Sequence, residues 1–121
     1  MERRAENNQC STAHKAPPAP YYAVIFSSTL ADDAEGYSAM AERMVDLAKE
    51  QDGFLGVESA ARTSEGFGIT VSYWRDLESI KKWKAQSEHA AAQKMGREAF
   101  YRSYRLRIAR VEREWGFERD E

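Results

Sequence analysis

Residues 72–104 contain the side chains of this chain that are best suited to chemistry on a small molecule. The stretch carries an imidazole at His89, a guanidinium at Arg97 and phenols at Tyr101 and Tyr104. A neutral imidazole can accept a proton near pH 7. A guanidinium or a phenol hydroxyl can then stabilise the negative charge that develops on an oxygen atom. These residue types predict catalysis by His89, Arg97 and Tyr101 on a substrate that ionises to an enolate or a phenolate.

The same stretch also supplies side chains that would line a pocket around such a substrate. Small-molecule sites are mostly apolar and aromatic, with a few polar groups that orient the ligand. At about 100° per residue, His89, Gln93 and Phe100 fall on one face of a helix. The residues predicted to contact the substrate are Trp74, Trp83, Gln93, Phe100 and Tyr104.

Each of these assignments has a structural alternative that the sequence leaves open. Trp83 can complete the apolar stripe of its helix as a core residue. His89 follows Ser87 by two residues and can cap the start of its own helical segment. Arg97 is one of six arginines between positions 97 and 113, which can pair with neighbouring glutamates on the surface. Ser72 can face a cleft between sheet and helices, or can hydrogen-bond the backbone instead.

Composition and spacing argue against several other classes of function. No second histidine lies three or four positions from His89, so we expect no metal site. The formal net charge of −2 gives no strong attraction to nucleic acid or to a membrane surface. Cys10 is the single cysteine, which excludes an intrachain disulfide. Since the chain also has no long apolar run and no signal-peptide pattern, we expect a cytoplasmic protein without nucleic-acid or membrane partners.

The elements that must position these residues can be read from local patterns. Residues 1–20, rich in charge and proline, are predicted to form an N-terminal tail, and residues 118–121 a C-terminal tail. Residues 21–117 form one predicted domain. Its expected elements are strands at 21–28, 54–62, 67–74 and 103–114, a helix at about 34–51 capped by Asp32 or Asp33, and a helix from the cap Asp76. That second helix is expected to bury Leu77, Ile80 and Trp83, to break at 84–86 and to restart at Ser87; the last strand is expected to bulge near Ile108.

The resulting order, strand, helix, strand, strand, helix, strand, predicts an α+β ferredoxin-like fold. A four-stranded antiparallel sheet would carry two helices on one face. The other face would still hold half of the apolar strand residues, and an uncovered apolar surface of that size marks an interaction site. Two sheets packed face to face would form a dimeric α+β barrel, so we expect a homodimer.

Four segments of the chain are similar to a known family. They are YYAVIF, QDGFLGVES, ITVSYWRDLESIKKWK and EHAAAQKMGREAFYRSYRLRIARVEREWGF, and the resemblance spans residues 21–117, nearly everything but the N-terminal tail. The chain resembles the antibiotic biosynthesis monooxygenase family of small dimeric α+β barrel proteins. This resemblance implies an oxidoreductase, a cofactor-independent monooxygenase that acts on a small aromatic or dicarbonyl substrate. In this interpretation no cofactor is bound.

The family resemblance also allows two alternatives. Haem-degrading relatives use an axial histidine about ten positions after the helix tryptophan, which here corresponds to Gln93. Glutamine lacks the imidazole nitrogen that holds haem iron, so a haem-binding monooxygenase would need His89 in that role. The other alternative is a dimeric small-molecule-binding or stress-related protein that has the scaffold without the chemistry, because one fold hosts many functions.

Overall fold

The computed structural model describes residues 19–32, 36–94 and 100–120, with side chains except at 88–94. The described elements follow the predicted order and confirm the ferredoxin-like α+β fold. They are β1 (Tyr21–Leu30), α2 (Tyr37–Lys49), β2 (Phe54–Ser59), β3 (Phe67–Trp74), α3 (Leu77–Lys94) and β4 (Tyr101–Val111).

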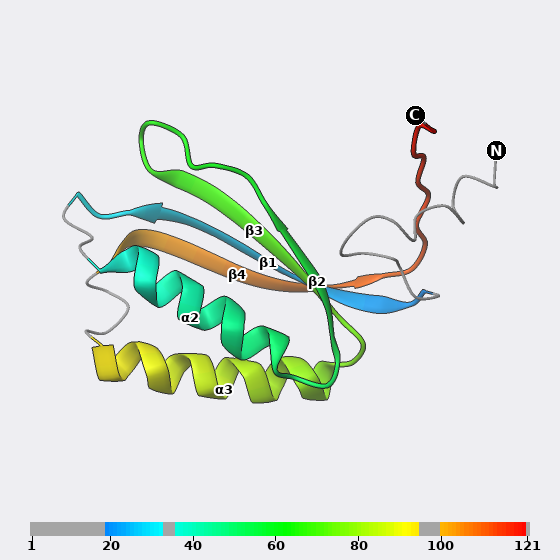
Figure 1. The fold of residues 1–121 in the computed structure, drawn as a ribbon, viewed down its shortest axis with the longest axis horizontal. Coiled ribbons are helices and arrows are strands. Elements are labelled where there is room, and N and C mark those ends of the chain that lie inside the picture. Colours follow the sequence, from blue (N-terminus) through cyan, green and yellow to red (C-terminus); the bar gives the residue numbers. More distant parts are fainter. Residues whose placement is uncertain (1–18, 33–35, 95–99, 121) are drawn as a thin grey trace.

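All four strands form one antiparallel sheet in the order β2-β3-β1-β4, and both helices lie on the same face of it (Figure 1). Val24 on β1 stands opposite Ser72 on β3 and Ile108 on β4. Because side chains alternate between the faces of a sheet, this register fixes which residues face the helices. Val24, Phe26 and Ser72 belong to the helix-facing set.

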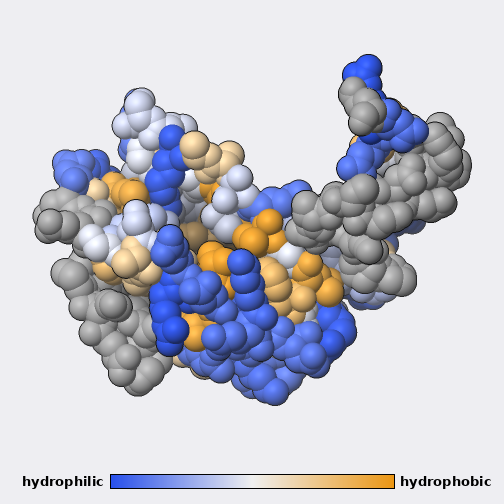
Figure 2. Space-filling model, viewed as in Figure 1, coloured by the Kyte–Doolittle hydropathy of each residue, from blue (hydrophilic) through white to orange (hydrophobic). Residues whose placement is uncertain are grey.

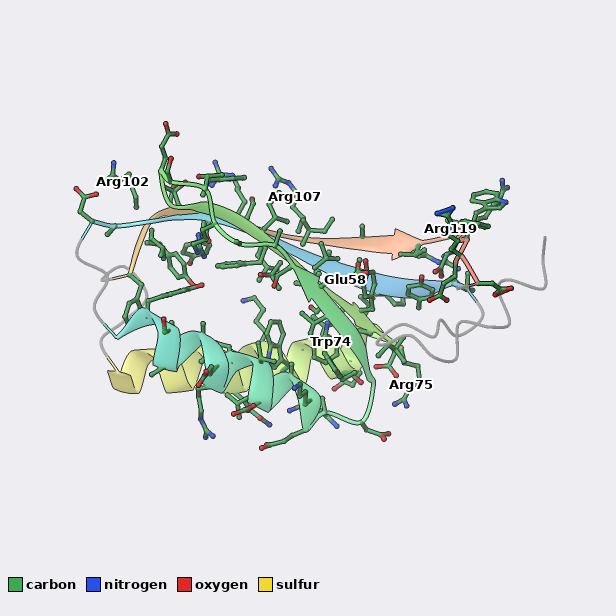
Figure 3. The ribbon with its side chains drawn as sticks, turned by 45° about the horizontal axis from the view of Figure 1, so that its top comes forward. Glu58, Trp74, Arg75, Arg102, Arg107 and Arg119 are labelled. Atoms are coloured by element: carbon green, nitrogen blue, oxygen red, sulfur yellow. The ribbon has the colours of Figure 1, made fainter. Side chains whose placement is uncertain are left out.

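The main core lies between one end of the sheet and the two helices. Val24, Ala48, Trp74 and Ile80 are its buried members, and the indole of Trp74 is 0% exposed. Figure 3 shows Trp74 between the sheet and the helices. A second buried pair, Met40 and Phe100, packs near the start of α2. Large aromatic side chains supply much of the apolar area in such cores.

The start of α3 is capped as the sequence predicts. Asp76 accepts a hydrogen bond from the backbone N–H of Ser79 through Oδ1, at 2.9 Å. This N–H donor lowers the pKa of the Asp76 carboxyl. The predicted buried stripe is only partly correct, since Leu77 is 51% exposed whereas Ile80 is buried and Trp83 half-buried.

The predicted break at 84–86 is wrong, because α3 continues without interruption to Lys94. The helix sequence contains no glycine or proline that would interrupt it. Ser87, taken as the start of a new segment, instead donates its hydroxyl proton to the carbonyl oxygen of Trp83, one turn earlier, at 2.9 Å. This back-bond satisfies the serine inside a continuous helix.

Two further local predictions are wrong. The N-cap of α2 is Gly36, with a positive φ of 87° and no side-chain cap, while Asp32 accepts from Arg102 at 3.0 Å. Asp33 lies outside the described residues. The pairing of β1 with β4 is regular at Ile108, and its irregularity falls between Thr29 and Leu30. The positive φ of Gly36 and the register shift after Thr29, rather than a side-chain pattern, determine the local structure in these two places.

The sheet face opposite the helices carries aromatic, aliphatic and charged groups. Tyr73 lies in edge contact with Tyr21, at 6.0 Å between ring centroids, and donates to Glu58 at 2.8 Å. Burial, with this bond to Glu58, raises the pKa of Tyr73 to about 12. Phe67 and Ile69 are 42% and 44% exposed on the same face.

None of the helices in the described part of the chain is long and apolar enough to cross a membrane.

Candidate functional site

A cavity of about 490 Å³ lies between the helices and the sheet. This volume falls within the range of small-ligand sites, roughly 300–1,000 Å³. Figure 2 shows hydrophobic surface exposed in the recess between the helical layer and the sheet, framed by hydrophilic surface. The hollow expected from the sequence under the helices is therefore present, and it opens to the outside.

Most of the cavity wall is apolar. Helix α2 contributes Met40, Met44 and Val45, while β1 contributes Val24 and Phe26 from the opposite side. Methionine side chains are flexible and adapt to ligands of different shape. This wall therefore suits the apolar part of a ligand, but it does not restrict the ligand to one shape.

Trp83 forms the wall on the side of α3, and its orientation is fixed by two contacts. Its indole N–H donates to the carbonyl oxygen of Met44 at 3.1 Å, which links α3 to α2. Its ring lies 5.2 Å from that of Trp74, which packs in turn on Phe54 at 5.5 Å. Trp74 supports this wall from behind, whereas Trp83 and Phe54 reach the cavity.

Four aromatic rings gather at one end of the cavity. Phe26 lies 5.5 Å from Tyr101 and 5.6 Å from Tyr104, while Tyr37 lies 5.8 Å from Tyr101. All four residues line the cavity. Edge contacts of this kind favour a rigid aromatic surface, on which a flat ligand can pack.

Hydroxyl groups supply the neutral polar groups of the wall. Thr70 and Ser72 lie on β3 and face the helices, while Ser87 lies on α3. Ser72 is buried, and its Oγ accepts a hydrogen bond from the indole N–H of Trp74 at 2.8 Å. Ser87 has the opposite arrangement, since its proton is donated to the carbonyl oxygen of Trp83.

Arg62 holds the end of the cavity where Tyr37 lies. Its guanidinium donates to the carbonyl oxygens of Ser28 and Gly66 at 3.1 and 2.7 Å. It also donates to the hydroxyls of Ser28 and Tyr37, each at 2.9 Å. These four bonds tie β1, the β2–β3 turn and α2 together, and they fix the phenol of Tyr37 at the cavity wall.

The charged residues among the described lining are both cationic. They are Lys84 on α3 and Arg105 on β4, and no described lining residue is a carboxylate. Arg105 pairs with Ser27 on the sheet face opposite the helices, so its charged group points away from the cavity. Three or more potential metal-ligating side chains do not cluster anywhere in the described part of the chain. With Lys84 at its edge and no carboxylate among the described lining residues, the cavity suits an anionic or electron-rich ligand better than a cation.

The structure brings together some of the residues predicted from the sequence. Trp83, Tyr101 and Tyr104 line the cavity, whereas Trp74 and Phe100 are buried beside it. His89 and Gln93 lie within helix α3, and their side chains are outside the described part; Arg97 lies outside the described residues.

Sequence reasoning missed two polar residues at this site. Tyr37 is not among the residues predicted for the site, although a phenol hydroxyl at a helix start is a signal for a polar role. Arg62 was placed in a strand, and it lies 25 residues from its partner Tyr37. No local pattern links residues so far apart.

A family model described as antibiotic biosynthesis monooxygenase matches residues 20–95. The chain is 52% identical over 100 residues to the uncharacterized protein YqjZ of Bacillus subtilis (strain 168), covering 83% of this chain and 87% of that protein. It is 31% identical over 61 residues to a jasmonate monooxygenase of Pyricularia oryzae (strain 70-15), covering 50% of this chain. The match spans only 28% of that second relative.

Known structures show the same fold. Rv0793 from Mycobacterium tuberculosis is 15% identical with a TM-score of 0.65, covering 81% of this chain and 100% of that one. SnoaB from Streptomyces nogalater, a cofactor-independent oxygenase, is 11% identical with a TM-score of 0.60, covering 81% and 97%. At these identities the similarity concerns the architecture alone.

Proposed function

Because the chain belongs to the antibiotic biosynthesis monooxygenase family, we propose that it oxygenates a small electron-rich aromatic or dicarbonyl compound without a bound cofactor. The observation that carries this proposal is the cavity of about 490 Å³, which combines aromatic walls, a few hydroxyls and the cationic residue Lys84. A relative named as a jasmonate monooxygenase supports the same class of reaction.

The chemistry requires little of the protein beyond binding and charge stabilisation. A substrate with an acidic CH₂ group loses a proton, and the resulting anion donates one electron to dioxygen. The substrate radical and superoxide combine to a peroxide anion, which takes back the proton and then loses water to leave a carbonyl group. The balance is R₂CH₂ + O₂ → R₂C=O + H₂O, so the substrate supplies all four electrons.

The wall residues have separate roles in this proposal. Trp83, Phe26 and Tyr104 hold the flat apolar body of the substrate, and Tyr101 is a candidate donor to its oxygen. Arg97 and Gln93 keep their predicted roles as an anion-stabilising and a substrate-contacting residue. A low-dielectric wall strengthens each of these interactions with a charged oxygen.

The proton acceptor in this proposal is His89, as predicted from its imidazole. The substitution His89→Ala tests the assignment separately from the oxygenation itself. A rate that falls at least ten-fold, most strongly below the pKa of the substrate, is expected if His89 is the base.

Oxygen uptake with an anthrone as substrate tests the oxygenation. We expect uptake above the rate in buffer, and we expect Ala41→Phe to abolish it because Ala41 lines the cavity and the new ring would fill it. Ala39→Phe is the matched control, since Ala39 is exposed on the same helix. Binding of the anthrone without any uptake would favour the alternative of a non-catalytic binding protein.

We further propose that two copies pair through the sheet face opposite the helices. Phe67 and Ile69 are exposed there, with Ile25 and Val71 half-exposed beside them. Figure 3 shows Arg107 on the same side, away from the helices. A half-apolar sheet face of this kind is stabilised when a second sheet covers it.

A further inference from the structure

We propose that the hydroxyls of Ser72 and Tyr37 donate hydrogen bonds to the anionic oxygen atoms of the substrate. Each hydroxyl oxygen already accepts a hydrogen bond from an N–H group of the protein, which leaves its proton for the substrate. The proposal rests on the proposed function, because it assigns the charge-stabilising groups of the same cavity. Trp74 and Arg62 would be positioning residues, which act on the substrate through Ser72 and Tyr37.

The hydrogen bond at Ser72 determines which way its hydroxyl can act. A serine hydroxyl has one proton to donate and two lone pairs that accept. The indole N–H of Trp74 can only donate, and its bond of 2.8 Å therefore occupies a lone pair of Ser72 Oγ. Within the described part of the chain, the Ser72 proton goes to no protein acceptor. Ser72 lines the cavity, where a ligand oxygen can take that proton.

Tyr37 is arranged in the same way at the aromatic end of the cavity. Arg62 has only donors, so its bond of 2.9 Å occupies a lone pair of the Tyr37 oxygen. The guanidinium also lies 5.1 Å from the centre of the Tyr37 ring. Its positive charge strengthens the phenol as a hydrogen-bond donor, and no protein acceptor takes the Tyr37 proton within the described residues.

Ser87 provides the contrast that makes the inference specific. It lines the same cavity, but its proton is already donated to the carbonyl oxygen of Trp83 at 2.9 Å. The two serine hydroxyls of this wall therefore have different hydrogen-bonding roles. Ser87 can only accept from a ligand, whereas Ser72 can donate, and only Ser72 favours an oxygen that carries negative charge.

The class of ligand follows from these donor and acceptor roles. Two donor hydroxyls, the cationic residue Lys84 and the lack of a carboxylate among the described lining residues favour a compound with a phenolate or enolate oxygen. The same arrangement disfavours an amine. The apolar remainder of the ligand would lie between Met44 and Trp83.

Titration of bound alizarin tests the proposal without oxygen chemistry. Alizarin is an anthraquinone phenol whose visible absorbance reports whether it is ionised. We expect Ser72→Ala and Tyr37→Phe each to weaken binding of the alizarin anion about ten-fold, with little change for the neutral form. The pKa of bound alizarin should therefore rise by about one unit in each variant.

Ser87→Ala is the matched control, and it should not raise the pKa of bound alizarin, because Ser87 can only accept from the ligand. Trp74→Phe keeps a ring but removes the indole N–H, so it should raise that pKa in the same direction as Ser72→Ala. If Ser72→Ala does not fold, because it leaves the Trp74 N–H without its acceptor, the double variant Trp74→Phe/Ser72→Ala removes both partners. Equal effects of Ser72→Ala and Ser87→Ala, or equal losses for both forms of alizarin, would overturn the proposal.

The result is separable from the test of oxygenation. Alizarin that binds as its anion through Ser72 and Tyr37, in a protein that takes up no oxygen with anthrones, supports the donor assignment and contradicts the proposed reaction. Oxygen uptake that is unaffected by Ser72→Ala and Tyr37→Phe contradicts the donor assignment alone.

Discussion

At one end of the cavity, Arg62 is joined to three segments of the chain by four hydrogen bonds. The side chain is half-buried, so its loss would leave several polar groups without partners in a region with little water. Because Arg62 also donates to the Tyr37 hydroxyl, the same side chain stabilises this end of the fold and sets the hydrogen-bonding role of Tyr37 in the cavity.

We expect Arg62→Ala to lower the free energy of unfolding by about 2–4 kcal/mol. Urea denaturation monitored by tryptophan fluorescence measures the change. Arg102→Ala is the control, because the ion pair of Arg102 with Asp32 is exposed and should contribute no more than about 1 kcal/mol. Similar losses in the two variants would show that the Arg62 bonds add no more than a surface pair.

The residue types of the site were partly predictable from the sequence. Trp83, Tyr101 and Tyr104 line the cavity as aromatic residues near a cleft are expected to do. The role of the Ser72 hydroxyl as a donor to a ligand was not predictable. It depends on a hydrogen bond from Trp74, which requires both side chains to lie on the same face of β3. The pairing of Arg62 with Tyr37 depends on how two distant segments pack.

At the scale of elements, the turn between α2 and β2 packs closely against the start of α3. Gly53 lies in this turn, and its carbonyl oxygen accepts from the N–H of Arg75 at 2.7 Å. A Cβ atom at Gly53 would lie 2.2 Å from Oγ and 2.7 Å from Cβ of Ser79, in the first turn of α3. Glycine is therefore required here for close approach, not for an unusual φ.

We expect Gly53→Ala to destabilise the protein by about 1–3 kcal/mol, because the contact with Ser79 Cβ cannot be relieved by a rotamer change. Thermal unfolding followed by circular dichroism measures the effect. Gly116→Ala is the matched control, since nothing lies within 4 Å of a Cβ atom at that position. A Gly53→Ala protein as stable as the Gly116→Ala protein would contradict the packing described for this turn.

Element boundaries were predictable where one side chain decides them. Asp76 caps α3 as its residue type and position predict. The continuity of α3 through Ser87 and the start of α2 at Gly36 depend on backbone bonds and a positive φ, for which the residue patterns gave no clear signal. The order of the elements was more predictable than their ends, because hydrophobic periodicity extends over many residues.

For the whole molecule, the ferredoxin-like fold follows from the order of strands and helices, and the structure confirms it. The homodimer remains a prediction, because it concerns a surface and a second copy of the chain. The exposed Trp115 and Phe117 in the segment after β4 add apolar surface to what a partner could cover.

We expect size-exclusion chromatography with light scattering to give the mass of a dimer. Ile69→Arg should shift the protein toward the monomer, because it places a charge in the centre of the proposed interface. Leu77→Arg is the control, since Leu77 is exposed on the helical side of the molecule. A wild-type protein that elutes as a monomer at micromolar concentration would contradict the predicted assembly.

The measurement that tests the central claim most directly is oxygen uptake with an anthrone in buffer free of added metals and cofactors. The account predicts one dioxygen consumed for each carbonyl product formed, with uptake lost in Ala41→Phe and retained in Ala39→Phe. Uptake no faster than in buffer, or uptake that persists when the cavity is filled, would contradict the claim that the cavity is an oxygenase site.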